Sequence, residues 1–353
     1  MLTSLIAFIV IIGVLVTIHE FGHYLAARSV GVTVEKFYIG FNAFGYGFKK
    51  VINGTEYGIG WLPLGGYVKL AGMLDESFDT ERSDDPGDFH LQPIWAKIWI
   101  MSAGVIMNFI LAIIIFAMMT FIQGELVGHS EEPVIGSVIK EQYDANINPI
   151  LTPAFEANLK GGDRILQIDD SEINDWVDIS NVILADTVLK TYNIKFDRDG
   201  QLNTISIKPA FMKLNIEKDS KLNKSLGIMP VPVYEERNIF QSTQVGARNT
   251  VFITIFLFDQ IAGIVTGKNS ANGLGGPIAI AGAAGDSLEN GLVDFFYLMA
   301  LLSISLGVMN ILPIPGLDGG HVFITLIEGA IGRELSIETK MRIQQVGVAM
   351  ILL

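Results

Sequence analysis

Residues 2–29 read LTSLIAFIVIIGVLVTIHEFGHYLAARS, an apolar run that continues without a break into two histidines and a glutamate. The run has neither the basic first region nor the small-residue cleavage site of a signal peptide. It is long enough to supply the roughly 20 helical residues that cross a hydrocarbon core of about 30 Å. We therefore predict a retained first transmembrane helix that carries ionisable side chains into the membrane.

The composition supports a membrane protein. Half of the 353 residues are hydrophobic and the mean hydropathy is +0.44, which is too apolar for an ordinary soluble chain of this length. A net charge of -13 argues against nucleic acid as a partner, because phosphates need a basic surface. The chain has no cysteine, so a metal must be held by Asp, Glu or one of five histidines: His19, His23, His90, His129 and His321.

Three further apolar runs predict the other membrane-spanning helices. Residues 94–122 form a second span, and residues 292–317 form a third that stays apolar until Pro313 and Pro315. Residues 346–353 look like the start of a fourth span that the sequence does not complete. We predict a polytopic α-helical membrane protein with about four transmembrane helices.

A fifth stretch, residues 245–268, is harder to place. Its apolar centre is only about 15 residues long, short of the roughly 20 that a span needs, and it contains Asp259 and Gln260. We expect it to form a helix along the membrane interface. A fifth span is the alternative.

The chain divides into three parts by composition. Residues 1–127 hold the first two spans and, between them, TEYGIGWLPLGGYVKLAGM (residues 55–73), which predicts a β-hairpin-like segment near the membrane. Residues 128–236 are polar and predict an inserted β-rich domain, and residues 237–353 complete the membrane part. Four basic residues follow the first span: Arg28, Lys36, Lys49 and Lys50. Because basic residues gather on the cytoplasmic side of a membrane, we predict a cytoplasmic hairpin-like segment and an extracytoplasmic inserted domain.

The histidines of the first span have the spacing of a zinc site. His19 and His23 are four residues apart, which places both imidazoles on one helix face, with Glu20 beside them. In this HExxH pattern two neutral histidines bind Zn²⁺ and the glutamate accepts a proton from the attacking water. The alternative is a polar seam between helices, but ionisable groups inside a bilayer are costly and usually functional.

A catalytic zinc needs a third protein ligand. The extended motif of soluble zinc proteases would need Gly and His where Ala26 and Ser29 stand. We therefore expect the ligand to be Asp318 in NILPIPGLDGGH (residues 310–321), at the carboxyl end of the third span and at a depth similar to that of the histidines. His321 is the competing candidate.

These two motifs together resemble the site-2 protease family, and in detail its bacterial zinc proteases. The second motif is N-x-x-P-x-P-x-L-D-G, formed by Asn310, Pro313, Pro315, Leu317, Asp318 and Gly319. Supporting matches are LPLGGYVKLAG (residues 62–72), GVIMN (residues 104–108) and GGPIAIA (residues 275–281), although Val105 replaces a proline common in relatives. LKGGDRILQIDD (residues 159–170) resembles part of the PDZ domain that these proteases carry outside the membrane.

The resemblance implies a zinc-dependent intramembrane endopeptidase in the bacterial inner membrane. Its substrates would be single-span membrane proteins already trimmed outside the membrane, such as anti-sigma factors or signal-peptide remnants. Glu20 would be the catalytic base, and His19, His23 and Asp318 the zinc ligands. Candidate substrate-binding residues are Asn310, Pro313, Pro315, Gly65, Gly66 and Tyr67, and the PDZ-like domain would act as a size filter or as a recruiting module.

Two other classes of protein remain open from the residues alone. A transporter or channel can also place histidine and carboxylate groups within a membrane. A membrane-anchored PDZ scaffold with a vestigial metal site would bind peptides without turnover. The sequence does not reveal the physiological substrate or the oligomeric state.

Overall fold

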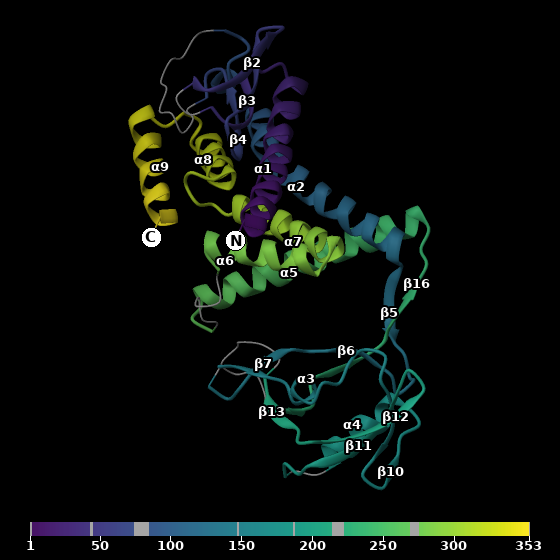
Figure 1. Ribbon diagram of the computed structural model, residues 1–353. Coiled ribbons are helices and arrows are strands. Elements are labelled where there is room, and N and C mark those ends of the chain that lie inside the picture. The colour runs from purple at the N-terminus through teal and green to yellow at the C-terminus, as the bar shows by residue number, and fades with distance from the viewer. Residues whose placement is uncertain are drawn as a thin grey trace. The chain divides into compact units, whose positions relative to one another are not determined.

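The computed structural model describes residues 2–42, 45–73, 85–146, 148–185, 188–213, 222–268 and 275–352. They form two compact units, which are described separately. The first unit contains residues 1–122, 238–266 and 274–353, and the second contains residues 123–237 with 267–273. Figure 1 labels many of the elements of both.

Among the described residues, four helices of the chain are long and apolar enough to cross a membrane. They are α1 (Leu2–Ser29), α2 (Ile94–Gln123), α5 (Ile239–Val265) and α7 (Leu292–Ile311). Helix α5 is a candidate that the prediction had placed along the membrane interface. Residues 346–352 of the predicted incomplete span belong to α9 (Ile337–Leu352), and their role as the start of a span stays a prediction.

The expected shortness of the segment around residues 245–268 is wrong. Helix α5 has 27 residues, because it begins at a capping box before the apolar stretch. Asn238 accepts a hydrogen bond from the Gln241 backbone N–H, and the Gln241 side chain accepts one from the Asn238 N–H. By length and composition α5 therefore joins the span candidates, and the reason for placing it along the interface no longer holds.

The apolar core of the first unit lies between α1, α2, α7 and the short helix α6 (Pro277–Asn290). Ile11 and Leu15 of α1 are fully buried there, as are Ala112 of α2 and Ile304 of α7. Three residues of α5 pack on the same cluster: Ile253, Leu257 and Ile261. The core holds together the helices that carry the polar residues of the next section.

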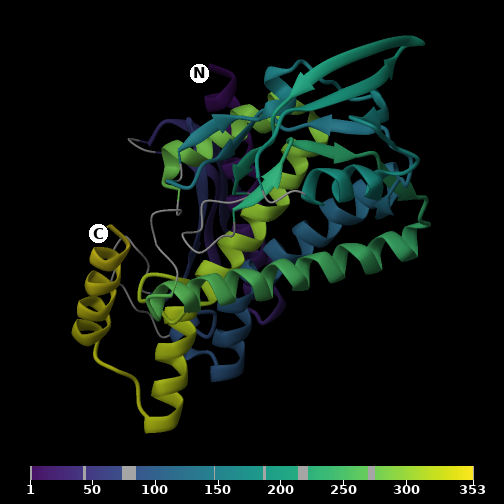
Figure 2. The ribbon, with the colours of Figure 1, turned by 90° about the horizontal axis from the view of Figure 1, so that it is seen from below.

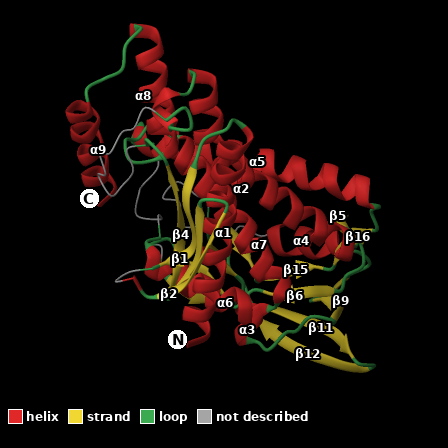
Figure 3. Ribbon diagram, turned by 90° about the horizontal axis from the view of Figure 1, so that it is seen from above, coloured by secondary structure: helices red, strands yellow, loops and turns green. Residues whose placement is uncertain are grey.

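A four-stranded sheet follows α1, with the order β2-β3-β1-β4. Its strands are β1 (Val34–Phe41), β2 (Gly47–Ile52), β3 (Thr55–Gly60) and β4 (Leu62–Leu70), and Figure 3 shows strands of this sheet beside α1. The β-hairpin-like segment expected within residues 30–93 is present as β2 paired with β3, whereas β3 and β4 flank β1 instead of pairing with each other. Only Trp61 separates β3 from β4, too few residues for a two-residue hairpin turn.

The third apolar run is interrupted as its prolines suggest. Helix α7 ends at Ile311, the link 312–317 contains Pro313 and Pro315, and α8 (Asp318–Ile331) begins directly after it. Asp318 therefore opens a new helix instead of closing the third span. Helices α8 and α9 follow each other at one side of the unit (Figure 2), joined by an ion pair between Glu328 and Lys340.

The second unit is a β-rich module. Its largest sheet has the order β10-β9-β11-β12, and Ile165, Ile168 and Ile194 lie in its buried core. The short helices α3 (Pro153–Glu156) and α4 (Trp176–Ala185) accompany the strands. The strands are β5 (Glu125–His129), β6 (Ile135–Val138), β7 (Glu141–Tyr143), β8 (Pro149–Leu151), β9 (Arg164–Ile168), β10 (Ser171–Glu172), β11 (Tyr192–Arg198), β12 (Gln201–Ile207), β13 (Ala210–Met212), β14 (Asn223–Ser225), β15 (Ile228–Pro230) and β16 (Pro232–Glu235).

Candidate metal centre

Helix α1 presents His19 and His23 on one buried face. Their side chains are only 6% and 5% exposed, and their Nε2 atoms lie 3.1 Å apart. The rings meet edge to face, with centroids 4.8 Å apart. Because the two histidines are about one helical turn apart, their imidazole nitrogens point to the same place, as the HExxH spacing predicts.

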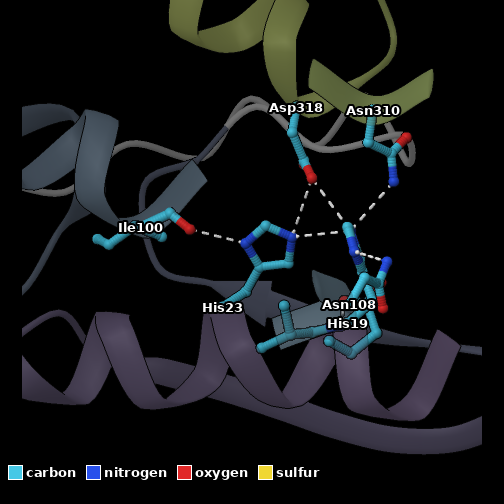
Figure 4. A network of polar contacts seen from close by, with 8 residues as sticks. His19, His23, Ile100, Asn108, Asn310 and Asp318 are labelled. Carbon is cyan, nitrogen blue, oxygen red and sulfur yellow. Dashed lines mark hydrogen bonds and ion pairs between the residues drawn. The ribbon is translucent and has the colours of Figure 1, made fainter. Parts of the chain in front are cut away.

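Asp318 completes the group from α8. Its Oδ2 lies 3.0 Å from His19 Nε2 and 3.4 Å from His23 Nε2 (Figure 4). The carboxylate sits in the first turn of α8, where the helix dipole favours negative charge. A Cβ on the next residue, Gly319, would overlap the carbonyl oxygens of Ile311 and Leu312, so glycine lets the proline-containing link fold onto α8.

These three donors fit a divalent metal ion. The ligand atoms of His19, His23 and Asp318 all lie within 4.8 Å of one another, and across the described ranges no other His, Asp or Glu residues form such a group. Apart from the two imidazoles, Asp318 Oδ2 is buried without a hydrogen-bond donor. Two histidines with one carboxylate are a known ligand set of catalytic zinc. His321, the competing candidate, is not a member of the group.

Helix α2 contacts the Nδ1 atoms of both imidazoles. His23 Nδ1 lies 2.8 Å from the backbone oxygen of Ile100, and His19 Nδ1 lies 3.1 Å from the side-chain Nδ2 of Asn108. The helices approach closely because Gly104 of α2 faces the ring nitrogens: a Cβ there would lie 2.5 Å from His23 Nε2 and 2.8 Å from His19 Nε2.

Glu20 lies beside the cluster on the wall of a cavity of about 590 Å³. Its Oε2 accepts a hydrogen bond of 3.1 Å from the backbone N–H of Val68. Among the described strands β4 lies at the edge of its sheet, so the Val68 N–H is available to donate to this carboxylate. The cavity therefore brings together the metal-ligand cluster, an acid–base group and a free strand edge.

The predicted substrate-binding residues fall into two groups. Asn310, Gly66 and Tyr67 line the large cavity, and Asn310 Nδ2 is 3.4 Å from His19 Nε2. Gly65, Pro313 and Pro315 are not among the residues that line it. Pro315 lines a separate cavity of about 60 Å³ together with residues of α8 and α9.

Tyr67 presents a neutral hydroxyl to its surroundings. Burial, followed by the nearby carboxylate of Glu56, raises the pKa of Tyr67 above its ordinary value. Its hydroxyl donates to Asn42 Oδ1 over 3.1 Å, and its ring stacks on Tyr38 with centroids 5.1 Å apart. The aromatic wall of the cavity is thus fixed by the register that pairs β4 with β1.

Sequence reasoning missed three contacts of this centre. Ile100 and Val68 contribute backbone atoms, which leave no signature in the sequence. Asn108 appeared only as a motif match, yet it is completely buried in an apolar helix. A polar amide inside an apolar run that predicts a span is a signal of function that could have singled it out.

Comparison with known proteins gives a consistent result. The family model described as peptidase family M50 matches residues 7–353. A Rickettsia conorii protein with the provisional name zinc metalloprotease is 32% identical, covering 99% of this chain and 95% of its own. Metalloprotease MmpA of Caulobacter vibrioides is 30% identical, covering 99% and 93%. The regulator of sigma-W protease RasP of Bacillus subtilis is 28% identical, covering 99% and 96%.

Proposed function

The chain belongs to peptidase family M50, the site-2 proteases, which makes it a zinc metalloendopeptidase of a multi-pass membrane type, and we propose that it cleaves peptide bonds within transmembrane segments of other proteins. Membership in an enzyme family leaves no ground for the transporter and scaffold alternatives. The proposal concerns the substrate and the residues that act on it.

One observation carries the proposal: an acid–base group and the candidate metal centre share one cavity beside helices that are long and apolar enough to span a membrane. His19, His23 and Asp318 converge on the cavity, and Glu20 lies on its wall. A substrate segment within the bilayer would reach these groups without leaving the depth of the helices.

We assign His19, His23 and Asp318 as the zinc ligands and Glu20 as the catalytic base. Bound Zn²⁺ would act as a Lewis acid and make a water molecule more acidic. Glu20 accepts the proton of the attacking water and passes it to the leaving amine. Its hydrogen bond to the Val68 N–H holds the carboxylate in place.

The substrate must unfold locally before cleavage, because a helical peptide bond in lipid is protected by its own hydrogen bonds. The free edge of β4 at Gly66 and Tyr67 offers backbone groups to an extended segment, with Gly65 allowing the strand to turn at φ +90°. Asn310 offers a side-chain amide to the substrate backbone. Pro313 and Pro315 break the helix and leave room around Asp318.

The second unit is proposed to be a single PDZ-like domain outside the membrane. Its four-stranded sheet, with LKGGDRILQIDD leading into β9, supports the likeness, and the positive-inside rule supports the orientation. As a filter, it would exclude proteins with bulky outer domains, so that cleavage follows an earlier trimming step. We place the enzyme in the bacterial inner membrane.

The proposed substrates are single-span membrane proteins. The name of the Bacillus subtilis relative, a regulator of sigma-W protease, supports anti-sigma factors as one class and a role in regulated intramembrane proteolysis. Remnants of signal peptides are a second class of suitable length.

The test is cleavage of a trimmed single-span substrate by the purified protein. We expect cuts within the apolar segment, removed by a zinc chelator and restored by added zinc. Glu20→Gln should keep its zinc and lose about 10²- to 10⁴-fold in rate, because general base catalysis is gone. Glu289→Gln, on the exposed face of α6, is the matched control and should cut normally. Full activity in Glu20→Gln would sink the assignment.

A further inference from the structure

The sheet of the first unit brings two positive charges to the large cavity. Lys36 of β1 and Lys69 of β4 are partners in the register of these strands, and both line the cavity of about 590 Å³ that holds the candidate metal centre. Residues two apart in a strand point to the same face, so Lys69 lies on the same face of β4 as Tyr67. The two lysines therefore lie beside the aromatic wall of the cavity.

The two lysines differ in their partners. Lys69 forms an ion pair with Glu35 at 3.3 Å. The cross-strand neighbour of Lys36 on β3 is Glu56, but the Glu56 carboxylate forms its ion pair with Lys49, at 3.2 Å. No described residue gives the Lys36 ammonium a hydrogen bond or an ion pair, although the residue is only partly exposed.

An unpaired ammonium that is partly withdrawn from water is unfavourable, because the charge loses hydration and gains no counter-charge. Of the described residues that line the cavity, two are acidic, Glu20 and Asp318. Glu20 already accepts from the Val68 N–H, and Asp318 lies against both imidazoles. The cavity thus supplies carboxylates to the proposed reaction but none to Lys36, which indicates that a ligand brings the anionic group.

The contacts between α1 and β4 show where Lys36 lies along the cavity. A Cβ on Gly13 would lie 3.6 Å from the Pro63 backbone oxygen, and Glu20 meets the Val68 N–H at 3.1 Å. Strand β4 therefore runs in the same direction as α1. Lys36 is the register partner of the residue directly after Val68, so it lies just beyond Glu20 towards the carboxyl end of α1. In the proposed topology this is the cytoplasmic side of the catalytic group.

We propose that Lys36 is a specificity-determining residue that binds an acidic side chain of the substrate, on the cytoplasmic side of the bond that is cut. This inference rests on the proposed function and adds a sequence preference to it. An extended segment advances about 3.3 Å per residue, so the acidic side chain should lie within the first few residues beyond that bond. A basic side chain at the same place would be repelled.

An anionic lipid offers the same charge as an acidic side chain. The cavity favours the substrate, because Lys36 shares it with Glu20 and with the candidate metal centre. A group that binds there lies beside the reacting bond, where a lipid headgroup would block the substrate.

The test uses the full-length protein in vesicles of zwitterionic lipid and trimmed single-span substrates that differ at one residue. Glu, Gln or Lys is placed in turn at each of the first three positions on the cytoplasmic side of the cut. At one of them the wild type should cut the Glu substrate about tenfold faster in kcat/KM than the Gln substrate, as expected for one charged hydrogen bond. The Lys substrate should be cut most slowly.

Variants of Lys36 should change this preference and leave the zinc content unchanged. Lys36→Met should cut the Glu and Gln substrates equally, and Lys36→Glu should prefer the Lys substrate. Lys50→Met, on the exposed strand β2 and outside the cavity, is the matched control and should keep the wild-type preference. Equal rates of the wild type on all three substrates, or an unchanged preference in Lys36→Met, would overturn the inference and leave the proposed function standing.

Two further outcomes separate the remaining explanations. If anionic lipid in the vesicles changes the wild-type rate equally for all three substrates, and Lys36→Met removes this effect, then Lys36 binds lipid and the inference is wrong. If the wild type binds zinc but cuts none of the substrates at any position, the proposed function fails, and the inference that rests on it fails with it.

Discussion

The smallest residue at the candidate metal centre is one of its tightest constraints. Gly104 lies where α2 meets both imidazoles, and a Cβ there would lie 2.5 Å from His23 Nε2 and 2.7 Å from His19 Cε1. Gly104→Ala must push the rings or the helix aside. Since displaced orienting contacts typically cost 10- to 100-fold in metal affinity, we expect a loss of that size, measured by chelator competition.

Gly282 provides the matched control for this substitution. It also lies in a helix, α6, but a Cβ there meets nothing within 4 Å. Gly282→Ala should leave zinc binding unchanged and raise stability slightly, by about 0.4–1 kcal/mol, because alanine restricts the unfolded chain. Equal zinc affinities in the two variants would contradict the role given to Gly104.

The sequence predicted the side chains of the candidate centre better than it predicted the backbone groups that hydrogen-bond to them. His19 and His23 were identifiable because a helix brings residues four apart together, and Asp318 because it was the acidic residue of the second motif. Their partners Ile100 and Val68 act through backbone atoms, so any side chain could occupy those positions. Only the fold shows which carbonyl and which N–H are used.

At the scale of elements, the four-stranded sheet of the first unit has a pH-dependent link between two strands. Tyr38 of β1 donates to Glu56 of β3 over 2.6 Å, and this bond, supported by Lys49, lowers the pKa of Glu56. Burial raises the pKa of Tyr38 to about 12. A lowered carboxylate pKa contributes stability that is present above its ordinary value of 4.5 and is lost as the pH falls through the folded-state pKa.

We therefore expect Tyr38→Phe to reduce the acid sensitivity of the fold. Its melting temperature should be lower than that of the wild type at about pH 6, and the difference should shrink as the pH falls below 4.5 and through the lowered folded-state pKa of Glu56. Thermal unfolding followed by fluorescence measures this. Tyr46→Phe, at an exposed position, should match the wild type throughout. A difference in melting temperature between Tyr38→Phe and the wild type that stays the same at every pH would contradict the link between Tyr38 and Glu56.

Helix α9 is attached to α8 by one carboxylate. Glu328 pairs with Lys340 at 2.7 Å and accepts from the Leu335 N–H at 2.8 Å, and both charged side chains are largely buried. Glu328→Gln leaves the lysine without its ion-pair partner. A loss of about 1.4 kcal/mol, typical of a charged hydrogen bond, would raise trypsin cleavage at exposed Arg333 about tenfold.

The neighbouring pair of Glu338 with Arg342 serves as the control. Both side chains are more than two-thirds exposed, at 71% and 77%, and such pairs contribute little. Glu338→Gln should therefore be cut at the wild-type rate. If the Glu328 and Glu338 variants are cut alike, the buried pair does not hold the helix.

Element boundaries were predictable where a local signal exists. Pro313 and Pro315 ended α7 as expected, because proline cannot continue a helix. The start of α5 was missed because a capping box of polar residues precedes the apolar stretch. The parallel pairing of β1 with β3 was missed because alternation of apolar residues predicts strands but not their partners.

At the scale of the whole molecule, residues 123–237, the long segment of the second unit, leave and rejoin the chain through one ribbon. Strand β5 pairs with β16, with His129 opposite Pro232 and Glu125 opposite Glu235. The two ends of the insertion therefore lie side by side. Residues 130–231 can be replaced by Asn-Gly, the preferred two-residue hairpin turn, with the ribbon kept intact.

This deletion distinguishes the two roles proposed for the PDZ-like unit. If the unit filters by size, the shortened protein should cut an untrimmed single-span substrate nearly as fast as a trimmed one, because nothing then excludes the bulky outer domain. If it recruits substrates by binding their tails, cleavage of the trimmed substrate should fall and the untrimmed one should stay uncut. Zinc content of the shortened protein is the control, since the proposed ligands all lie in the other unit. Rates unchanged for both substrates would rule out either role.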